Sequence, residues 1–332
     1  MKSIIILFII FSICELKAQT SNSFVRFSGS VINNTTKELT IFNYKDYKKV
    51  FLLGQNGNFS DTLKIERGHY TLRCGNEISK IFLAPGYDIK MFLDINKFDE
   101  SIHYNGIGSP INNYLAKMCL YNENNSLDFI KEKELSIEGH FNYIINFYMG
   151  IDKLLDNNNI EDNEFISDQK NNHDFEILYR LLDRNKKELF NEKSNSNVSS
   201  YFAKEFKKIP LNDSILFKKN GIYKYLVLSY FNYGLTAKNP IVLKNFNEIK
   251  NSLIKKEVLK NIGKGISIKN QEFELYYNTL KSICSDTTLL NKYAKKYNQI
   301  LKLKPGVASP SFTCKDINGK SISLSDFKGN LV

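Results

Sequence analysis

The spacing of apolar residues changes once along this chain, and that change restricts the folds available to it. Over residues 24–104, short apolar runs such as Val25 and Phe27 alternate with polar residues and are separated by Gly, Asn and Pro. After about residue 105, apolar residues recur every three to four positions, beginning at Ile111. A period of two is typical of strands and a period of 3.6 of helices. The sequence therefore predicts an α+β fold, with a strand-rich part followed by a helical part.

Residues 24–104 have the features of an antiparallel β-sandwich or a small barrel. Their predicted strands are short and follow one another at close spacing with turn residues between them. Asn56-Gly57 lies between "KKVFLL" and "FSDTLKI", which is typical of the tip of a hairpin. Gly106 and Gly108 form a Gly-x-Gly pair, but we expect no strand leading into a glycine-rich helix start there. The pair is therefore a weak candidate for a phosphate loop.

Residues 105–303 are predicted to be helical, and Pro110 suits the first turn of the first helix. Tyrosines recur at helical spacing, among them Tyr225, Tyr230 and Tyr276. Such a row of tyrosines could line a groove, but at this spacing it more often belongs to the core. Asn-rich stretches between the helical segments are predicted to be loops.

The first eighteen residues resemble a targeting segment. Lys2 precedes an apolar run that ends at Ile13, and Ala18 offers a small residue for cleavage. The run is too short to span a bilayer comfortably, so an uncleaved anchor is the weaker alternative. Lipidation of Cys14 is a second alternative, which the bulky Ile13 disfavours. Residues 1–18 are thus predicted to be a signal peptide, and the protein to be exported to the periplasm or cell envelope. Membrane association is expected only with a retained signal or a lipidated Cys14.

The chain is basic, with a formal net charge of +11. Its lysines are mostly interleaved with apolar and acidic residues, as in "IKKEVLKNIGKG". A solvated helix face explains this pattern better than a phosphate-binding patch. Since an exported protein also rarely meets nucleic acid, no nucleic-acid partner is expected.

Four cysteines remain after the predicted signal peptide: Cys74, Cys119, Cys284 and Cys314. No two are close in sequence, and the chain contains no C-x-x-C motif. Export makes disulfides feasible and leaves several pairings open. Apolar surroundings at Cys119 and Cys284 instead favour buried free thiols.

The four histidines, His69, His103, His140 and His173, are scattered and lack the pairing of a metal site. No Ser-His-Asp or Cys-His arrangement has a recognisable spacing. We therefore predict no catalytic, cofactor-binding or metal-binding residue within residues 24–304, and no cofactor.

The C-terminal stretch has a more specific pattern. It runs G-x-A-x-P-x-F from Gly306 to Phe312, followed by "KDINGK" and "SISLSDFKG". These residues predict a strand, a hairpin at Asn318-Gly319, a second strand and a one-turn cap at residues 325–327. The pattern resembles the start of TlpA/ResA-like thiol–disulfide oxidoreductases, in the redoxin (AhpC/TSA) branch of the thioredoxin superfamily. The resemblance implies that residues 304–332 are the N-terminal fragment of a thioredoxin-like domain.

The strand-rich part adds to this resemblance. Its segments "QNGNFS", "IFLAPGYDIKMFLD" and "YNGIGSPINNYL" resemble DUF4369, an uncharacterised domain found before such redoxin domains. The resemblance implies a DUF4369-like domain at residues 24–104, a helical domain at residues 105–303 and the redoxin fragment thereafter.

In that family, a strand corresponding to the one beginning at Leu331 leads into a W-C-x-x-C motif. By this resemblance the first active-site cysteine would fall roughly ten residues beyond Val332, at a helix N-terminus that lowers its pKa. The chain as given has no C-x-x-C and no Trp. It is therefore expected to lack disulfide reductase activity, although its family acts on protein thiols and disulfides. Cys314 has two readings, an extra redox thiol and a buried strand cysteine, and the second is favoured.

The sequence leaves two hypotheses for function. The first is an envelope thiol–disulfide oxidoreductase family member that lacks its catalytic C-x-x-C in the sequence given. The second is a non-enzymatic exported binding or scaffold protein, made of the strand-rich and helical domains and acting on an unknown envelope partner.

Overall fold

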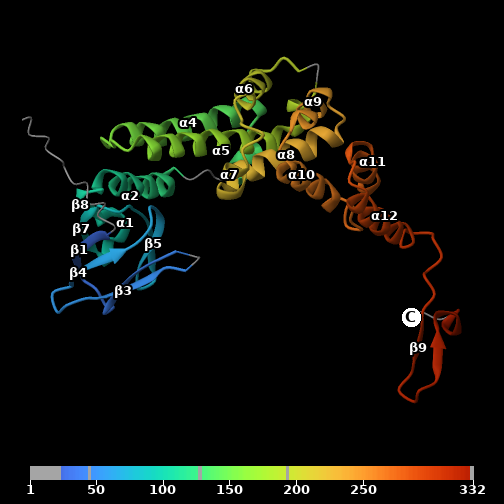
Figure 1. The fold of residues 1–332 in the computed structure, drawn as a ribbon, viewed down its shortest axis with the longest axis horizontal. Helices are drawn as coiled ribbons and strands as arrows, with labels where there is room; N and C mark the ends of the chain where they lie inside the picture. The colour runs from blue at the N-terminus through green and yellow to red at the C-terminus, as the bar shows by residue number, and fades with distance from the viewer. Residues whose placement is uncertain (1–23, 44–45, 126–128, 192–193, 330–332) are drawn as a thin grey trace, which may run out of the picture. The chain divides into compact units, whose positions relative to one another are not determined.

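The computed structural model describes residues 24–43, 46–125, 129–191 and 194–329. Strands form the N-terminal part and helices the middle of a mixed α+β fold, as the sequence predicts (Figure 1). The predicted signal peptide and Cys14 lie outside the described residues. The chain divides into two compact units, the first comprising residues 1–127 and 149–166, the second residues 128–148 and 167–332. Among the described helices, none has the length and apolar character needed to cross a membrane.

The first sheet of the first unit has the strand order β4–β1–β7–β8. Its strands are β4 (Asn58–Lys64), β1 (Phe24–Ile32), β7 (Asp88–Asp94) and β8 (His103–Ile107). β1 pairs antiparallel with β4 but parallel with β7. The expectation of a purely antiparallel architecture is therefore wrong at the β1–β7 pair. A parallel pair needs a long connection, and the intervening strands of the other sheet provide it.

The second sheet is antiparallel and has the order β3–β2–β5–β6. Its strands are β3 (Lys48–Leu52), β2 (Glu38–Phe42), β5 (Gly68–Cys74) and β6 (Glu77–Leu83). No sheet formed by the described strands closes on itself into a barrel.

The hairpin predicted at Asn56-Gly57 is wrong, because β3 and β4 belong to different sheets. The turn itself forms, with Gly57 at φ 73°, a conformation that favours glycine. The Gly57 carbonyl accepts a hydrogen bond from the Val31 amide at 3.0 Å, at the end of β1. A Cβ on Gly57 would lie 1.9 Å from the Val31 carbonyl oxygen. The turn is thus packed against the first sheet, and it carries the chain from one sheet to the other.

Both sheets contribute side chains to one apolar core. The ring of Phe27 in β1 lies 5.5 Å from that of Phe51 in β3, centroid to centroid, so the two sheets meet directly. Alternate residues along the strands are buried, as the period of two predicts. The core includes Val25, Leu39, Ile41, Leu63, Leu72, Ile81, Ile89, Met91 and Leu93.

Hydrogen bonds of two consecutive asparagines hold the helix that follows β8 against the sheets. After η1 (Ile95–Lys97) and α1 (Phe98–Ser101), α2 spans Ser109–Asn124 with Pro110 in its first turn, as predicted. The buried amide of Asn112 accepts from the Phe82 amide at 2.8 Å and donates to the Phe82 and Gly108 carbonyls at 2.9 Å. Asn113 makes the equivalent pair of hydrogen bonds with Tyr104, each at 2.8 Å. Because every polar atom of the Asn112 amide side chain has a partner, its burial is well compensated.

Gly106 and Gly108 do connect a strand to a helix, contrary to the expectation from sequence. Gly106 lies in β8, and Gly108, at φ 96°, immediately precedes α2. A Cβ on Gly106 would lie 2.1 Å from the Asp88 carbonyl oxygen, and one on Gly108 would lie 2.2 Å from the Tyr87 ring. Close packing against β7 and Tyr87 therefore explains both glycines, without a phosphate.

The second unit is helical. Two helices, α4 (Ile137–Asp156) and α5 (Asn163–Leu189), contribute residues to both units. The others are α3 (Phe129–Glu134), α6 (Asn197–Phe206), α7 (Ser214–Lys219), α8 (Gly221–Thr236), α9 (Pro240–Glu248), α10 (Ser252–Lys264), α11 (Phe273–Ile283) and α12 (Thr287–Leu301).

Asparagine and aspartate begin many of these helices. Side-chain oxygens of Asn220, Asn239 and Asn251 accept hydrogen bonds from backbone amides in the first turns of α8, α9 and α10. Asp213 and Asp286 do the same for α7 and α12. These side chains satisfy backbone amides that would otherwise lack partners.

The tyrosines that recur at helical spacing are only partly buried in the core. Tyr230 is buried as expected, whereas Tyr276 is half-buried and Tyr225 is 60% exposed. α8 is buried on more than one face, since Tyr223, Val227 and neighbouring residues are also inaccessible. Burial of α8 therefore extends beyond one helix face, because α7, α9, α10 and α11 all contact it.

The predicted C-terminal hairpin is present. β9 (Thr313–Lys315) pairs antiparallel with β10 (Ser321–Ser323), and η2 (Leu324–Phe327) follows (Figure 1). Ser323 and Asp326 form a capping box on η2, where the sequence predicts a one-turn cap. None of residues 305–329 is buried.

Candidate functional site

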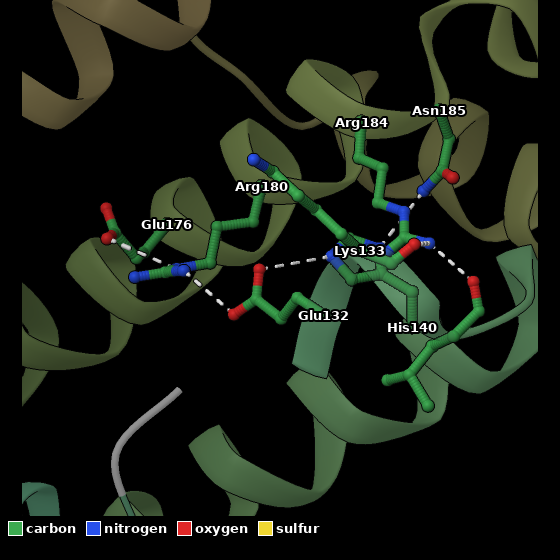
Figure 2. Close-up of polar contacts among 8 residues, drawn as sticks. Glu132, Lys133, His140, Glu176, Arg180, Arg184 and Asn185 are labelled. Carbon is green, nitrogen blue, oxygen red and sulfur yellow. Dashed lines mark hydrogen bonds and ion pairs between the residues drawn. The ribbon is translucent and has the colours of Figure 1, made fainter. Parts of the chain in front are cut away.

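A charged cavity in the second unit is the strongest candidate for a functional site. It has a volume of about 360 Å³ and lies between α3, α4 and α5 (Figure 2). It is lined by Glu132, Lys133, His140, Glu176, Tyr179, Arg180, Asp183 and Arg184. Glu176, Arg180 and Arg184 are spaced by four residues, which places them on one face of α5.

Glu132 of α3 is the centre of the cluster. One of its carboxylate oxygens lies 3.3 Å from Arg180 Nη1 and the other 3.6 Å from His140 Nε2. Its side chain is only 9% exposed, so the carboxylate depends on these neighbours for compensation. Arg180 Nε in turn lies 3.5 Å from Glu176 Oε1, which extends the ion-pair network along α5.

His140 of α4 is buried beside this network, with 1% of its surface exposed. Burial, together with the positive charges of Arg184 and Arg180, lowers its pKa to about 4. The imidazole is therefore neutral at pH 7. Its Nδ1 lies 3.3 Å from the Asn185 side-chain nitrogen, which can only donate, so the proton of the neutral ring is assigned to Nε2, facing Glu132. Because both ring nitrogens face neighbouring side chains, the orientation of the His140 ring in the cavity wall is fixed.

Arg184 ties the start of the second unit to α5. Its Nη2 donates to the Lys133 carbonyl at 3.1 Å and also to the Leu135 carbonyl (Figure 2). These carbonyls lie at the C-terminal end of α3, where helices leave acceptors without an internal partner. The next residue, Asn185, has non-helical backbone angles, φ −102° and ψ 20°, so α5 is kinked at the same place.

Three buried polar atoms of the cavity have no hydrogen-bond partner: Glu176 Oε2, Arg180 Nε and Arg184 Nη1. Each unsatisfied buried group of this kind costs about 1–3 kcal/mol, and more when it is charged. The cavity thus presents two guanidinium donors and one carboxylate acceptor. Its lining residues include no thiol and no hydroxyl except the Tyr179 phenol. The arrangement is suited to binding a polar group rather than to nucleophilic chemistry.

Sequence reasoning named His140 only as one of four scattered histidines without a site role, and it missed the residues around it. The signal for α5 was present, because Glu176, Arg180 and Arg184 recur at helical spacing. Nothing in the sequence joins them to Glu132, which lies more than forty residues earlier and meets Arg180 only through the fold. The other histidines lie elsewhere: His69 against the Phe82 ring, His103 beside the Ser101 carbonyl and His173 against the Tyr148 ring.

The cysteines are free thiols in the described structure. Burial raises the pKa values of Cys74 and Cys284. At Cys119, burial and then the charges of Asp99 and Glu123 raise the thiol pKa to about 11. These three thiols are therefore poor nucleophiles at neutral pH. Cys314 lies in β9 as predicted but is exposed, so the expectation of a buried strand cysteine is wrong, because the described residues form no second layer over the hairpin.

Asp99, Cys119 and Glu123 bring three potential metal-ligand atoms within 4.8 Å of one another. The Cys119 thiol donates to Asp99 Oδ1 at 3.7 Å. Its raised pKa keeps the thiol protonated, and nothing beyond the cluster itself points to an ion.

An apolar groove of about 520 Å³ lies among α6, α8 and α9 and includes Phe206 and Tyr230. The Tyr230 hydroxyl accepts a hydrogen bond from Asn245 at 2.8 Å, and Asn239 donates to the Phe190 carbonyl. These polar groups of the groove are therefore satisfied within the protein, unlike those of the charged cavity.

Comparison with known proteins found no family model, no curated protein and no solved structure that matches the chain.

Proposed function

We propose that the chain belongs to the envelope TlpA/ResA-like thiol–disulfide oxidoreductases and that its sheets and helices precede a redoxin domain beginning near residue 304. The observation that carries this proposal is the C-terminal hairpin. Its order of strand, Asn-Gly turn, strand and capped single turn is the one expected from the family pattern. Apolar side chains in and next to it, including Phe312 just before β9 and Ile317 at the turn, are exposed. A strand pair with apolar residues is stable only when another layer covers it, and a redoxin domain would supply that layer.

The strand-rich unit supports the same proposal. Its two sheets share one core, with Phe27 of one sheet against Phe51 of the other. This favours a sandwich as its finer architecture, in keeping with the DUF4369-like domain proposed at residues 24–104.

The chemistry proposed for the family needs a thiol pair that the described cysteines do not provide. The thiolate of a C-x-x-C motif attacks one sulfur of a substrate disulfide, giving a mixed disulfide and one substrate thiol after protonation. The second cysteine then attacks the mixed disulfide, releases the second substrate thiol and leaves the motif oxidised. The substrate gains the two electrons that the motif loses. The proposed partners are therefore protein disulfides in the periplasm or cell envelope.

The test compares the native protein purified from the cell envelope with a recombinant protein of residues 19–332. We expect the native protein to reduce insulin disulfides when dithiothreitol regenerates it, and residues 19–332 to show no activity above the reductant alone. Robust activity of residues 19–332 would contradict the proposal, and a Cys314→Ser variant would then show whether that exposed thiol is responsible.

The charged cavity favours a second candidate function. An exported binding protein without redox activity would use the helical unit, where three buried polar atoms lack partners. In the same assay, this candidate predicts that the native protein is as inactive as residues 19–332.

A further inference from the structure

The cavity between α3, α4 and α5 has hydrogen-bonding capacity that the protein itself does not use. Glu176 Oε2, Arg180 Nε and Arg184 Nη1 are each buried without a hydrogen-bond partner. More than nine in ten buried polar groups in native proteins have a partner. Three exceptions lining one cavity of about 360 Å³ indicate that a further molecule completes the site.

The charges of the lining residues specify what kind of molecule fits. Lys133, Arg180 and Arg184 are positive, Glu132, Glu176 and Asp183 are negative, and the neutral His140 adds nothing. The formal charges cancel, so the site has no reason to prefer a ligand with a net charge. The site does present groups of both charges to a ligand, because the atoms without hydrogen-bond partners belong to guanidinium and to carboxylate groups.

The existing contacts show which groups remain available. Both oxygens of Glu132 face neighbours within the protein, and Arg184 Nη2 is used on two backbone carbonyls. What remains is the other terminal nitrogen of Arg184 and the second oxygen of Glu176, Oε2. Arg180 Nε makes no hydrogen bond but lies 3.5 Å from Glu176 Oε1, so the Arg180 guanidinium contributes its positive charge between the two. Guanidinium matches the geometry of a carboxylate, and a buried carboxylate oxygen is best matched by an ammonium group.

The spacing of these atoms along α5 limits the size of the ligand. Residues 176 and 184 are separated by about 12 Å along the helix axis. Long side chains lean toward the helix N-terminus, which brings the Arg184 guanidinium closer to Glu176. Arg180 lies between the two. The remaining distance between the Glu176 carboxylate and the Arg184 guanidinium suits a molecule whose opposite charges are a few bonds apart.

We propose that this cavity binds a small zwitterion, of the size of an amino acid or a dipeptide, with its carboxylate on Arg184 and Arg180 and its ammonium group on Glu176. The site is independent of the proposed redox function, since it uses no cysteine and lies wholly within the second unit.

The test is calorimetric titration of the residue 19–332 protein with glycylglycine. Two analogues each lack one charge: N-acetylglycylglycine has no ammonium group, and glycylglycinamide has no carboxylate. We expect glycylglycine to bind, and each analogue to bind at least about tenfold more weakly, as the loss of one charge-assisted hydrogen bond implies. Glucose, a neutral polyhydroxy probe, should not bind.

Variants identify the site. Glu176→Gln keeps the shape of the side chain and removes its charge, so it should reduce the preference for glycylglycine over N-acetylglycylglycine. Arg184→Lys should weaken glycylglycine and leave glycylglycinamide unaffected. Glu134→Gln, on the exposed face of α3, is the matched control and should change neither affinity.

Equal binding of glycylglycine and both analogues, preferential binding of glucose or the absence of any binding would each overturn the proposal. In the last case, ordered water alone satisfies the three atoms. The proposal would also be overturned if the Glu176→Gln variant, shown to be folded by its far-UV circular dichroism, kept the full preference for glycylglycine over N-acetylglycylglycine.

Discussion

The β5–β6 hairpin and the β9–β10 hairpin are built from similar local signals but have different surroundings. Tyr70, Leu72 and Ile81 of the first hairpin are buried against the other sheet. The second hairpin has shorter strands and fewer apolar residues, among them Ile322 in β10. Ile317 at its turn is fully exposed, and no residue between 305 and 329 is buried. Turn residues and caps are enough to define a hairpin, whereas its stability comes from a covering layer. The comparison indicates that the second hairpin needs a partner that the described residues do not supply.

The largest expected difference is in thiol reactivity. Cys314 in β9 is exposed, whereas Cys74 in β5 is buried. Labelling of Cys74 requires opening of the sheet, so its rate should be lower by a factor of about 100 or more. Mass-spectrometric mapping of iodoacetamide labelling at pH 8 measures both rates in one sample. Similar rates at the two cysteines would show that the first hairpin is no better protected than the second.

A second prediction concerns the pH dependence of labelling at Cys119. Its pKa is raised to about 11, and only the thiolate reacts. The rate should therefore rise about tenfold per pH unit between pH 7 and pH 10, without a plateau. An Asp99→Asn variant should react faster at pH 8, because it removes a negative charge that disfavours the thiolate. A plateau near pH 8.5 in the unaltered protein would contradict the assignment.

Truncation of a core side chain should have a large effect on stability in the first hairpin. Leu72 is fully buried, so Leu72→Ala should lower the free energy of unfolding by about 2–5 kcal/mol. Urea unfolding followed by far-UV circular dichroism and tyrosine fluorescence suits a chain without tryptophan. A loss below about 0.5 kcal/mol, the range of surface substitutions, would mean that Leu72 is not core.

The smallest effect is expected at Phe312, which directly precedes β9 of the second hairpin. Phe312 is 45% exposed, so Phe312→Ser in the residue 19–332 protein should change the free energy of unfolding by less than about 0.5 kcal/mol. The same substitution in the native protein should cost more if, as proposed, a redoxin domain covers this residue. Equal effects in both proteins would remove the argument for a covering layer.

Local features of the fold were predictable from the sequence, and pairings between distant segments were not. The strand period, Pro110 at the start of α2 and the cap at Ser323 and Asp326 all follow from neighbouring residues. The turn at Gly57 was also predictable, but its role between two sheets depends on contact with Val31, which no local pattern reveals.

The candidate site shows the same limit. The row of charged residues on α5 is visible in the sequence, whereas its contact with Glu132 and His140 requires three helices to pack together. The exposure of Cys314 was mispredicted because burial of a strand residue depends on a layer elsewhere in the chain.

The most direct test of the account is the intact mass of the native protein from the cell envelope, combined with peptide mapping of its C-terminal region. The account predicts a mass greater than that of residues 19–332 and a peptide that continues from Val332 into a W-C-x-x-C motif. A mass equal to that of residues 19–332 would contradict it, and the function would then lie in the strand-rich and helical units.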